Sequence, residues 1–301
     1  MKRNTDDFLI FYHLIELGSF SKAAEKVGLT KSVISKRITR LEQELSVQLI
    51  FRTTRKLTLT EAGEVFFRHA REIYLSVENA QEELKGLSDT FSGTIRLTVP
   101  TISGELILPQ AIAEFSEKFP DITVHMDLDN QFVDLLSGGY DLAIRTGVLP
   151  DSSLIARRLV DAHWIICGAP NYFEKHTIPK VPQDLTEHNC LGYSFQETGS
   201  DEWLFKGERE PFTLKVAGNF CTNNASALRR AALLGQGLIY VPKVLVAEDL
   251  KSGSLVEVLH KQVGKCLGIF AVYPYTKHLP VKTKLFIEHI YDSYNRNAES
   301  F

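Results

Sequence analysis

Cysteine is scarce in this chain, and the four present stand far apart: Cys167, Cys190, Cys221 and Cys266. They form no closely spaced pair, which argues against a zinc cluster and against a scaffold built on disulfides. No apolar run approaches the roughly 18–20 uninterrupted residues that a membrane span needs. The amino-terminal segment has no short apolar core followed by small residues, so no secretory signal is expected. These absences predict a cytoplasmic protein with no membrane partner.

Motifs that carry catalysis are also missing. No glycine-rich loop has the spacing of a nucleotide-binding motif, and no Gly-x-Ser-x-Gly elbow is present. The nine histidines include no pair spaced i, i+4, which would hold a metal on one helix face. We therefore expect no catalytic residue, no metal site and no cofactor, and the protein is not predicted to be an enzyme.

What is present is an uneven distribution of charge. The 301 residues, 44% hydrophobic and 24% charged, are typical of a soluble chain of two or three domains. The net charge of -3 is the sum of two oppositely charged parts. Residues 1–60 hold 11 Lys and Arg against 6 Asp and Glu, a net of +5. The remaining residues hold 23 against 31, a net of -8. A basic head on an acidic body indicates an anionic partner for the head.

The basic head is predicted to contain three helices and a hairpin. Gly18 and Gly28 end the first two helices, and the third begins at Thr30 or Lys31. In the third helix an apolar stripe recurs at helical spacing, formed by Ile34, Ile38, Leu41 and Leu45. The short Ala-rich helix and tight turn before it favour a helix-turn-helix over about residues 20–39.

The side of the third helix away from that stripe carries small hydroxyls and long cations. A helix that enters a major groove needs slender residues for close approach and cations for phosphates or base edges. Strand-like residues near 49–51 and 57–59 flank a basic tip, as in a wing that contacts phosphate. A solvated amphipathic helix and a plain surface hairpin are the alternatives. The candidate DNA-binding residues are Ser32, Val33, Ser35, Lys36, Thr39, Arg40, Arg52 and Arg55.

Four stretches of this head carry a family resemblance: residues 19–24, 29–38, 41–45 and 49–63. In order and spacing they resemble the amino-terminal signature of LysR-type transcriptional regulators, a bacterial family. Lys31, Ser32 and Val33 depart from the family's usual residues at base-reading positions, so no operator sequence is carried over. The resemblance implies a winged helix-turn-helix domain over residues 1–60.

A long helix is predicted next, over residues 61–90. Its apolar residues recur every three or four positions, at Ala62, Phe66, Ala70 or Ile73, Val77, Ala80, Leu84 and Leu87. Such a stripe needs a partner, most simply its copy in a second chain, although it could pack on its own body. The resemblance implies a linker helix that forms the dimer contact of a homodimer or homotetramer. Residues 86–93 are predicted to be a hinge.

Residues 91–301 alternate between short strands and helices, which predicts an α/β fold with a parallel sheet. Helices are expected at 106–119 and 132–139, and a second run of strands begins near His163. The resemblance implies a two-lobed effector-binding domain of the periplasmic-binding-protein type. Lobe I is expected at about 91–162 and 268–301, and lobe II at about 163–267.

Ligands of parallel sheets bind beyond the carboxyl ends of the strands. Hydroxyls beside a helix start and an arginine at a strand end favour a small anion. A strand-end turn with local capping is the plain alternative for each position. The candidate effector-binding residues are Thr101, Ser103, Asn130, Arg145, Thr222 and Pro242.

Together the residues and the resemblance predict a transcriptional regulator that binds double-stranded DNA and a small anionic effector, and RNA polymerase if it activates. One alternative keeps this architecture but senses redox state, through Cys221 beside Thr222, or pH or a protein partner. Another is an enzyme or solute-binding protein built on the two-lobed body, which leaves residues 1–60 unexplained.

Overall fold

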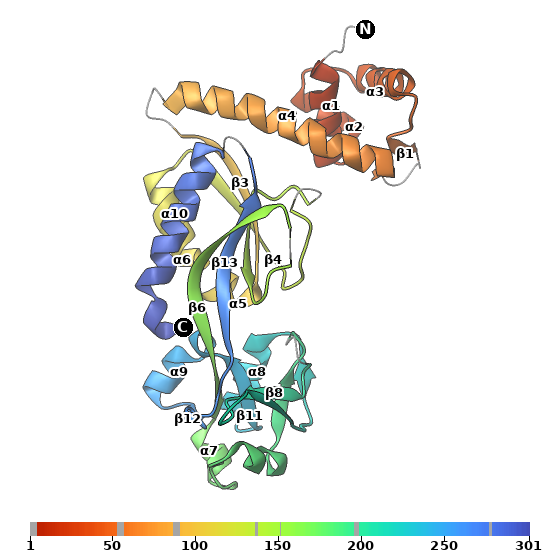
Figure 1. Ribbon diagram of the computed structural model, residues 1–301. Coiled ribbons are helices and arrows are strands. Elements are labelled where there is room, and N and C mark those ends of the chain that lie inside the picture. The colour runs from red at the N-terminus through yellow and green to blue at the C-terminus, as the bar shows by residue number, and fades with distance from the viewer. Residues whose placement is uncertain are drawn as a thin grey trace.

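A computed structural model describes residues 5–52, 57–86, 91–135, 138–150, 152–195, 199–276 and 279–301. The head, a long helix and two lobes follow one another along the molecule (Figure 1). The long helix, α4 (Glu61–Gly86), lies across the end of the first lobe and carries the head. In the described part of the chain no helix is both long and apolar enough to cross a membrane.

The head has the predicted elements. They are α1 (Thr5–Glu16), α2 (Phe20–Lys26), α3 (Lys31–Leu45) and an antiparallel hairpin of β1 (Ile50–Arg52) with β2 (Leu57–Leu59). The side chains of Ser19 and Thr30 accept backbone N–H groups at the starts of α2 and α3. Gly28 adopts a φ of +68° in the turn between them, which glycine does without strain. The predicted helix-turn-helix is therefore confirmed.

The apolar stripe of α3 is buried at three of its four positions. Ile34, Ile38 and Leu41 pack with Phe11 in the core of the head. Leu45 is 40% exposed, because it is the last residue of α3 and the chain turns away directly after it. The burial of the other three fixes which side of α3 faces solvent.

The first half of α4 packs on the head of its own chain. The ring centroid of Phe66 lies 4.6 Å from that of Phe8, and those of Tyr12 and Tyr74 are 4.3 Å apart. We expected the apolar stripe of α4 to face a second chain. Its first part, around Phe66, is instead covered by α1 of the same chain. Val77 lies beyond α1 and is exposed.

Each lobe has three parallel strands covered by helices. In lobe I these are β3 (Gly93–Val99), β4 (Ile122–Leu128) and β5 (Leu142–Thr146), with α5 (Thr101–Leu106), α6 (Leu108–Lys118) and α10 (Val281–Arg296). In lobe II they are β7 (Cys190–Tyr193), β10 (Cys221–Thr222) and β11 (Leu238–Pro242), with α7 (Pro170–Phe173), α8 (Ala225–Leu233) and α9 (Ala247–Ser252). Each lobe buries its own apolar core.

Two long strands join the lobes (Figure 1). They are β6 (Leu154–Gly168) and β13 (Cys266–Pro274), which pair with each other antiparallel. Within the described residues they complete one nine-stranded sheet in the order β10-β7-β11-β6-β13-β5-β3-β4, with β12 (Val256–Val258) on β6. The sheet is therefore mixed at its centre, where the strand order had predicted a parallel sheet. The second run also begins earlier than His163, because β6 starts at Leu154 in lobe I.

Two further predictions are corrected. The helix expected at 106–119 begins at Leu108, because Pro109 suits a first turn but would clash with the preceding turn inside a longer helix. The helix expected at 132–139 does not form at 132–135, and residues 136–137 lie outside the described part. Turn hydrogen bonds close this segment at Gly138 and Tyr140, with Gly139 at a φ of +73°. The hairpin of β8 (Glu202–Phe205) and β9 (Phe212–Lys215) was not predicted.

Candidate DNA interface and effector cleft

The solvent side of α3 holds the six predicted DNA-binding residues of this helix. Ser32, Val33, Lys36 and Arg40 are exposed, and Ser35 and Thr39 are half-buried. The Thr39 hydroxyl donates to the Ser35 carbonyl at 2.9 Å. Because that bond occupies the hydroxyl hydrogen of Thr39, the most accessible donors on this side are Lys36 and Arg40.

Two arginines of α3 have different surroundings. Arg37 Nε donates to Asp7 Oδ1 of α1 at 2.5 Å, so this side chain ties α3 to α1. Arg40 lies on the solvent side and its Nε donates to Glu44 one turn later at 2.8 Å. Of the two, Arg40 is far more exposed, with 74% of its side chain accessible against 25% for Arg37.

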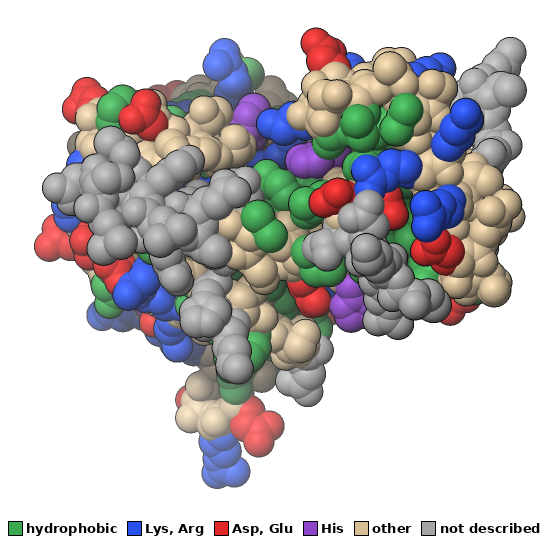
Figure 2. Space-filling model, turned by 90° about the horizontal axis from the view of Figure 1, so that it is seen from above, with side chains coloured by type: hydrophobic (Ala, Val, Ile, Leu, Met, Phe, Trp, Pro, Cys, Tyr) green, Lys and Arg blue, Asp and Glu red, His purple; other side chains and the backbone are tan. Residues whose placement is uncertain are grey.

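The structure describes only part of the β1–β2 wing. Arg52 ends β1, but its side chain and all of Arg55 lie outside the described residues. Other Lys and Arg side chains lie along the outer edge of the head, on the right-hand side of Figure 2. Asp and Glu side chains lie among them in the same view, so this edge carries charges of both signs.

A cavity of about 410 Å³ lies between the two lobes and is named here the interlobe cleft. Its walls come from the ends of β3, β5, β7 and β11 and from the crossing strands β6 and β13. Four of the six predicted effector-binding residues line it: Ser103, Asn130, Arg145 and Pro242. The rule that ligands bind beyond carboxyl strand ends thus placed these four residues at one cavity.

Arg145 is only 4% exposed and is held by neutral oxygens. Its Nη1 donates to the Asp129 carbonyl at 3.1 Å, and its Nη2 donates to Thr98 Oγ1 at 3.2 Å. Burial lowers the pKa of this guanidinium, and the nearby Asp129 carboxylate opposes that shift. The positive charge therefore sits in a polar socket beside the cleft, where an anion can pair with it.

The other two predicted residues do not line the cleft. The Thr101 backbone N–H donates to Asn130 Oδ1 at 3.0 Å, and Asn130 Nδ2 donates to the Thr101 hydroxyl at 3.2 Å. Thr101 thus fixes the amide of Asn130, which does reach the cleft. The Thr222 hydroxyl accepts the backbone N–H of Asn224 at 3.1 Å, in the turn before α8.

Sequence reasoning missed a second cation in the cleft, Lys265. It is 7% exposed, and its Nζ lies 3.8 Å from the ring centroid of Trp164. Pro242 pairs with Trp164, and the backbone N–H of Trp164 donates to the Lys265 carbonyl at 3.0 Å. Lys265 precedes β13, and antiparallel pairing with β6 brings it to the carboxyl end of β11. A rule for parallel strands does not predict this position.

Aromatic side chains make up much of the remaining wall, and they were not predicted either. Those lining the cleft are Phe132, Trp164, Tyr193, Phe195 and Phe301. Burial raises the pKa of Tyr193 to about 12, so this phenol stays neutral. Within the described residues the cleft has no acidic side chain in its lining. A ligand with flat apolar groups and a negative charge fits these walls.

Among the described residues, no group of three or more His, Cys, Asp or Glu side chains could hold a metal ion. Cys221 and Cys266 are exposed, whereas Cys167 and Cys190 are buried.

Comparisons with known proteins cover both halves of the chain. A family model described as "Bacterial regulatory helix-turn-helix protein, lysR family" matches residues 5–64. A second, described as "LysR substrate binding domain", matches residues 88–294. The regulator PtxR of Pseudomonas aeruginosa is 33% identical over 293 residues, covering 97% of this chain and 94% of PtxR. CrgA of Neisseria meningitidis is 32% identical over 302 residues, covering 99% of each.

Solved structures agree with these matches. The full-length virulence activator AphB of Vibrio cholerae has a TM-score of 0.61 and 31% identity, covering 95% of this chain and 98% of AphB. The structure of CrgA has a TM-score of 0.63 and 28% identity, covering 97% and 99%. The likeness extends over head, long helix and both lobes.

Proposed function

The chain belongs to the LysR family of transcriptional regulators, and we propose that it binds double-stranded DNA through the solvent side of α3 and the β1–β2 wing. The observation that carries this proposal is the exposure of Lys36 and Arg40 beside small side chains on the second helix of a helix-turn-helix. As a DNA-binding regulator with an effector domain it is not an enzyme, and we place its action in the cytoplasm. Two heads in a homodimer or homotetramer would bind a partly palindromic site.

For the effector we propose a small anionic molecule held in the interlobe cleft. Ser103 and Asn130 would supply hydrogen bonds, Arg145 and Lys265 positive charge, and Pro242 an apolar contact. Thr101 would act through Asn130, and Thr222 through the turn that begins α8. Closure of the lobes on the ligand would change the relative placement of the heads, coupling ligand binding to DNA geometry. A regulator that activates in this way would also contact RNA polymerase.

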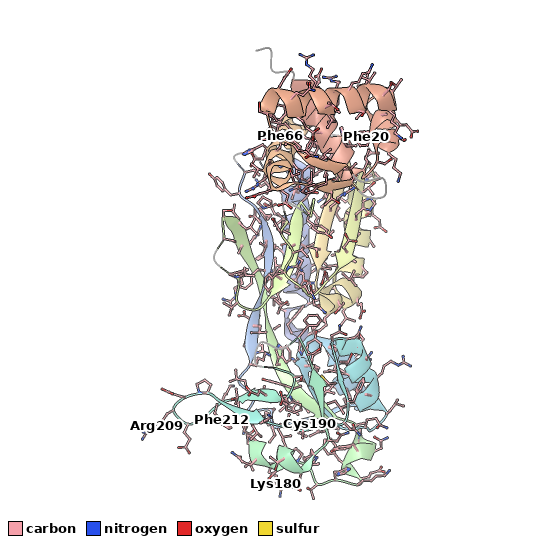
Figure 3. All side chains as sticks on the ribbon, turned by 90° about the vertical axis from the view of Figure 1, so that its right-hand side faces the viewer. Phe20, Phe66, Lys180, Cys190, Arg209 and Phe212 are labelled. Carbon is pink, nitrogen blue, oxygen red and sulfur yellow. The ribbon has the colours of Figure 1, made fainter. Side chains whose placement is uncertain are left out.

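The DNA-binding proposal is tested by genome-wide mapping of the tagged protein's binding sites. The Lys36→Ala, Arg40→Ala double variant should lose the sharp peaks of the wild type. Its affinity for a bound fragment should fall at least about tenfold, as expected for lost phosphate or base contacts. The matched control is Lys180→Ala, Arg209→Ala, which removes two exposed cations in lobe II, far from the head (Figure 3).

The control variant should keep the wild-type peaks, since its fold and α3 are untouched. Peaks that survive in the α3 variant would show that DNA does not bind through Lys36 and Arg40. Absence of peaks in the wild type would refute the proposal that the protein binds DNA.

A further inference from the structure

On one side of the interlobe cleft, a short turn of each lobe contacts the other lobe. In lobe II this turn is η2 (Lys243–Leu245), which directly follows β11. In lobe I it is η3 (Ala298–Ser300), which follows α10 and leads to Phe301. The chain beyond α10 lies where the two lobes meet (Figure 1). We name η2, η3 and Phe301 together the interlobe latch.

Hydrogen bonds tie η3 to lobe II and to a crossing strand. Lys243 Nζ reaches from η2 and donates to the Glu299 backbone carbonyl at 2.8 Å. The backbone N–H of His163 on β6 donates to the backbone oxygen of Phe301 at 3.0 Å. A hydrogen bond from a charged donor is stronger than one between neutral groups. The turn after α10 is thus fixed to lobe II as well as to the strand that joins the lobes.

Apolar side chains at the latch interlock the two cores. Phe301 is 3% exposed, and its ring centroid lies 5.6 Å from that of Tyr294 in the lobe I core. Val244 of η2 packs against this lobe I core, although the strand before it belongs to lobe II. Ile102 of α5 makes the reverse contact, packing against the lobe II core. A change in the angle between the lobes would therefore expose apolar surface, which costs free energy.

On the lobe I side the latch has a firm base. Near the end of α10, Arg296 Nη2 lies 2.5 Å from Glu114 Oε2 of α6. One turn of chain earlier, His289 Nε2 lies 2.9 Å from the Ala111 carbonyl oxygen of α6. Well-packed interiors deform little, so η3 moves with lobe I as one body. The bond from Lys243 to η3 therefore restrains lobe II against lobe I.

The latch also forms part of the wall of the interlobe cleft. Val244 and Phe301 line the cleft, together with Pro242 at the start of η2. A ligand in the cleft would therefore contact the latch directly. Resting on the effector cleft proposed above, we propose that the interlobe latch is a regulatory restraint, which holds the two lobes at one angle and lets this angle change when it is released. Closure of two lobes around a ligand needs such a movable contact.

The test measures the distance between the lobes by electron spin resonance in the full-length protein. One spin label is placed at Glu117→Cys, on the exposed side of α6, and the other at Arg209→Cys, in lobe II. Cys221→Ser and Cys266→Ser remove the exposed thiols. Excess unlabelled chain removes distances between copies. The measurement uses no ligand, so it tests the latch separately from the proposed effector.

Two variants release the latch in different ways. Lys243→Met keeps the apolar stem and removes the donor to η3, and Phe301→Ala removes the ring. The matched control is Lys251→Met, because Lys251 is an exposed lobe II cation whose Nζ donates to Glu248 within α9 at 2.7 Å. Circular dichroism checks the fold of each variant. Lys243→Met decides the result if Phe301→Ala does not fold.

One dominant distance is expected in the wild type and in the control. In the latch variants a second distance should appear, with a population relative to the first at least about tenfold above the wild type, since a hydrogen bond from a charged group is lost in one variant and a buried ring in the other. An unchanged distribution in the folded latch variants would overturn the inference. The same change in Lys251→Met would overturn it too, because that variant leaves the latch intact.

Discussion

The four cysteines divide into two pairs by their surroundings. Burial raises the pKa of the Cys190 thiol to about 12 and raises that of Cys167 still further. Cys221 is exposed, and Cys266 is exposed at the start of β13 with a pKa that partial burial raises. The thiolate is the reactive form, so only the second pair can respond to oxidants in the folded protein.

We therefore predict selective alkylation by iodoacetamide at pH 8, read by peptide mass spectrometry. Cys221 should be labelled first and Cys266 more slowly, while Cys167 and Cys190 stay unlabelled until the protein is denatured. A pKa near 12 leaves about a thousandth of the thiolate of an ordinary cysteine at this pH. Rapid labelling of Cys190 would contradict its burial. Separately, regulation that survives Cys221→Ser would remove the redox alternative.

At the residue scale, sequence reasoning succeeded where local rules decide position. Ser103, Arg145 and Pro242 were correctly placed at the cleft, because each lies at or just beyond the carboxyl end of a parallel strand, which is a known edge of the sheet. Lys265 could not be found in this way, because its place depends on pairing with residues about a hundred positions earlier. Thr101 was found at the right edge, but whether its hydroxyl faces a ligand or Asn130 depends on packing detail that spacing does not carry.

At the scale of elements, α4 shows how one apolar stripe serves two partners. Its first part, around Phe66, is covered by α1, but the stripe continues past Val77, which is 39% exposed. By sequence the later stripe positions are Ala80, Leu84 and Leu87, whose side chains lie outside the described residues. We predict that this second part meets another copy of the chain.

Val77→Glu should weaken self-association, because a charge would replace a side chain whose burial contributes about 1.5–3 kcal/mol. Such a loss raises the dissociation constant of a dimer at least about tenfold. Light scattering after size exclusion, over a dilution series, measures the change. The matched control is Val65→Glu, since Val65 is also exposed on α4 but lies off the stripe. Equal effects of both variants on self-association would show that the stripe containing Val77 is not the contact between copies.

Element predictions failed where long-range pairing overrides local pattern. The strand β6 runs through 15 residues because it pairs with β13 along one part and with β11 along another. Its sequence offers no periodic signal that extends across both lobes. The run at 132–139 has helical composition but is short, and its two glycines favour a turn over a helix end. In contrast, the helices of the head follow from caps and periodicity alone.

At the scale of the whole molecule, two strands connect the interlobe cleft with the head. One end of β5 follows Asp141, which faces Arg71 of α4, and its other end carries Arg145 in the cleft. The neighbouring parallel strand β3 carries Arg96, which pairs with Glu16 of α1. At its carboxyl end β3 is followed by Pro100, which lines the cleft. We predict that a ligand that shifts the carboxyl ends of these short strands acts on the contacts that hold the head.

Two ion pairs link the head and α4 to lobe I: Arg96 with Glu16, and Arg71 with Asp141. Removing both charges in Glu16→Gln, Asp141→Asn should loosen the head from lobe I, because Arg71 is then buried without its carboxylate partner. Breaking a buried pair by removing one member costs about 3–5 kcal/mol, and a more exposed pair adds up to about 1 kcal/mol. Labels at Gln43→Cys in α3 and Arg209→Cys in lobe II, in a Cys221→Ser, Cys266→Ser background, report the distance by electron spin resonance.

The wild type should give a narrow distance distribution and the double variant a broad one. Asp161→Asn is the matched control, since Asp161 pairs with Arg158 on β6, away from the head. It removes one lobe I carboxylate without touching α1 or α4, so its distribution should match the wild type. A double variant as narrow as the wild type would mean that apolar contacts of α4 alone hold the head. In that case β3 and β5 would have no charged link through which a ligand in the cleft could reach the DNA-binding helix.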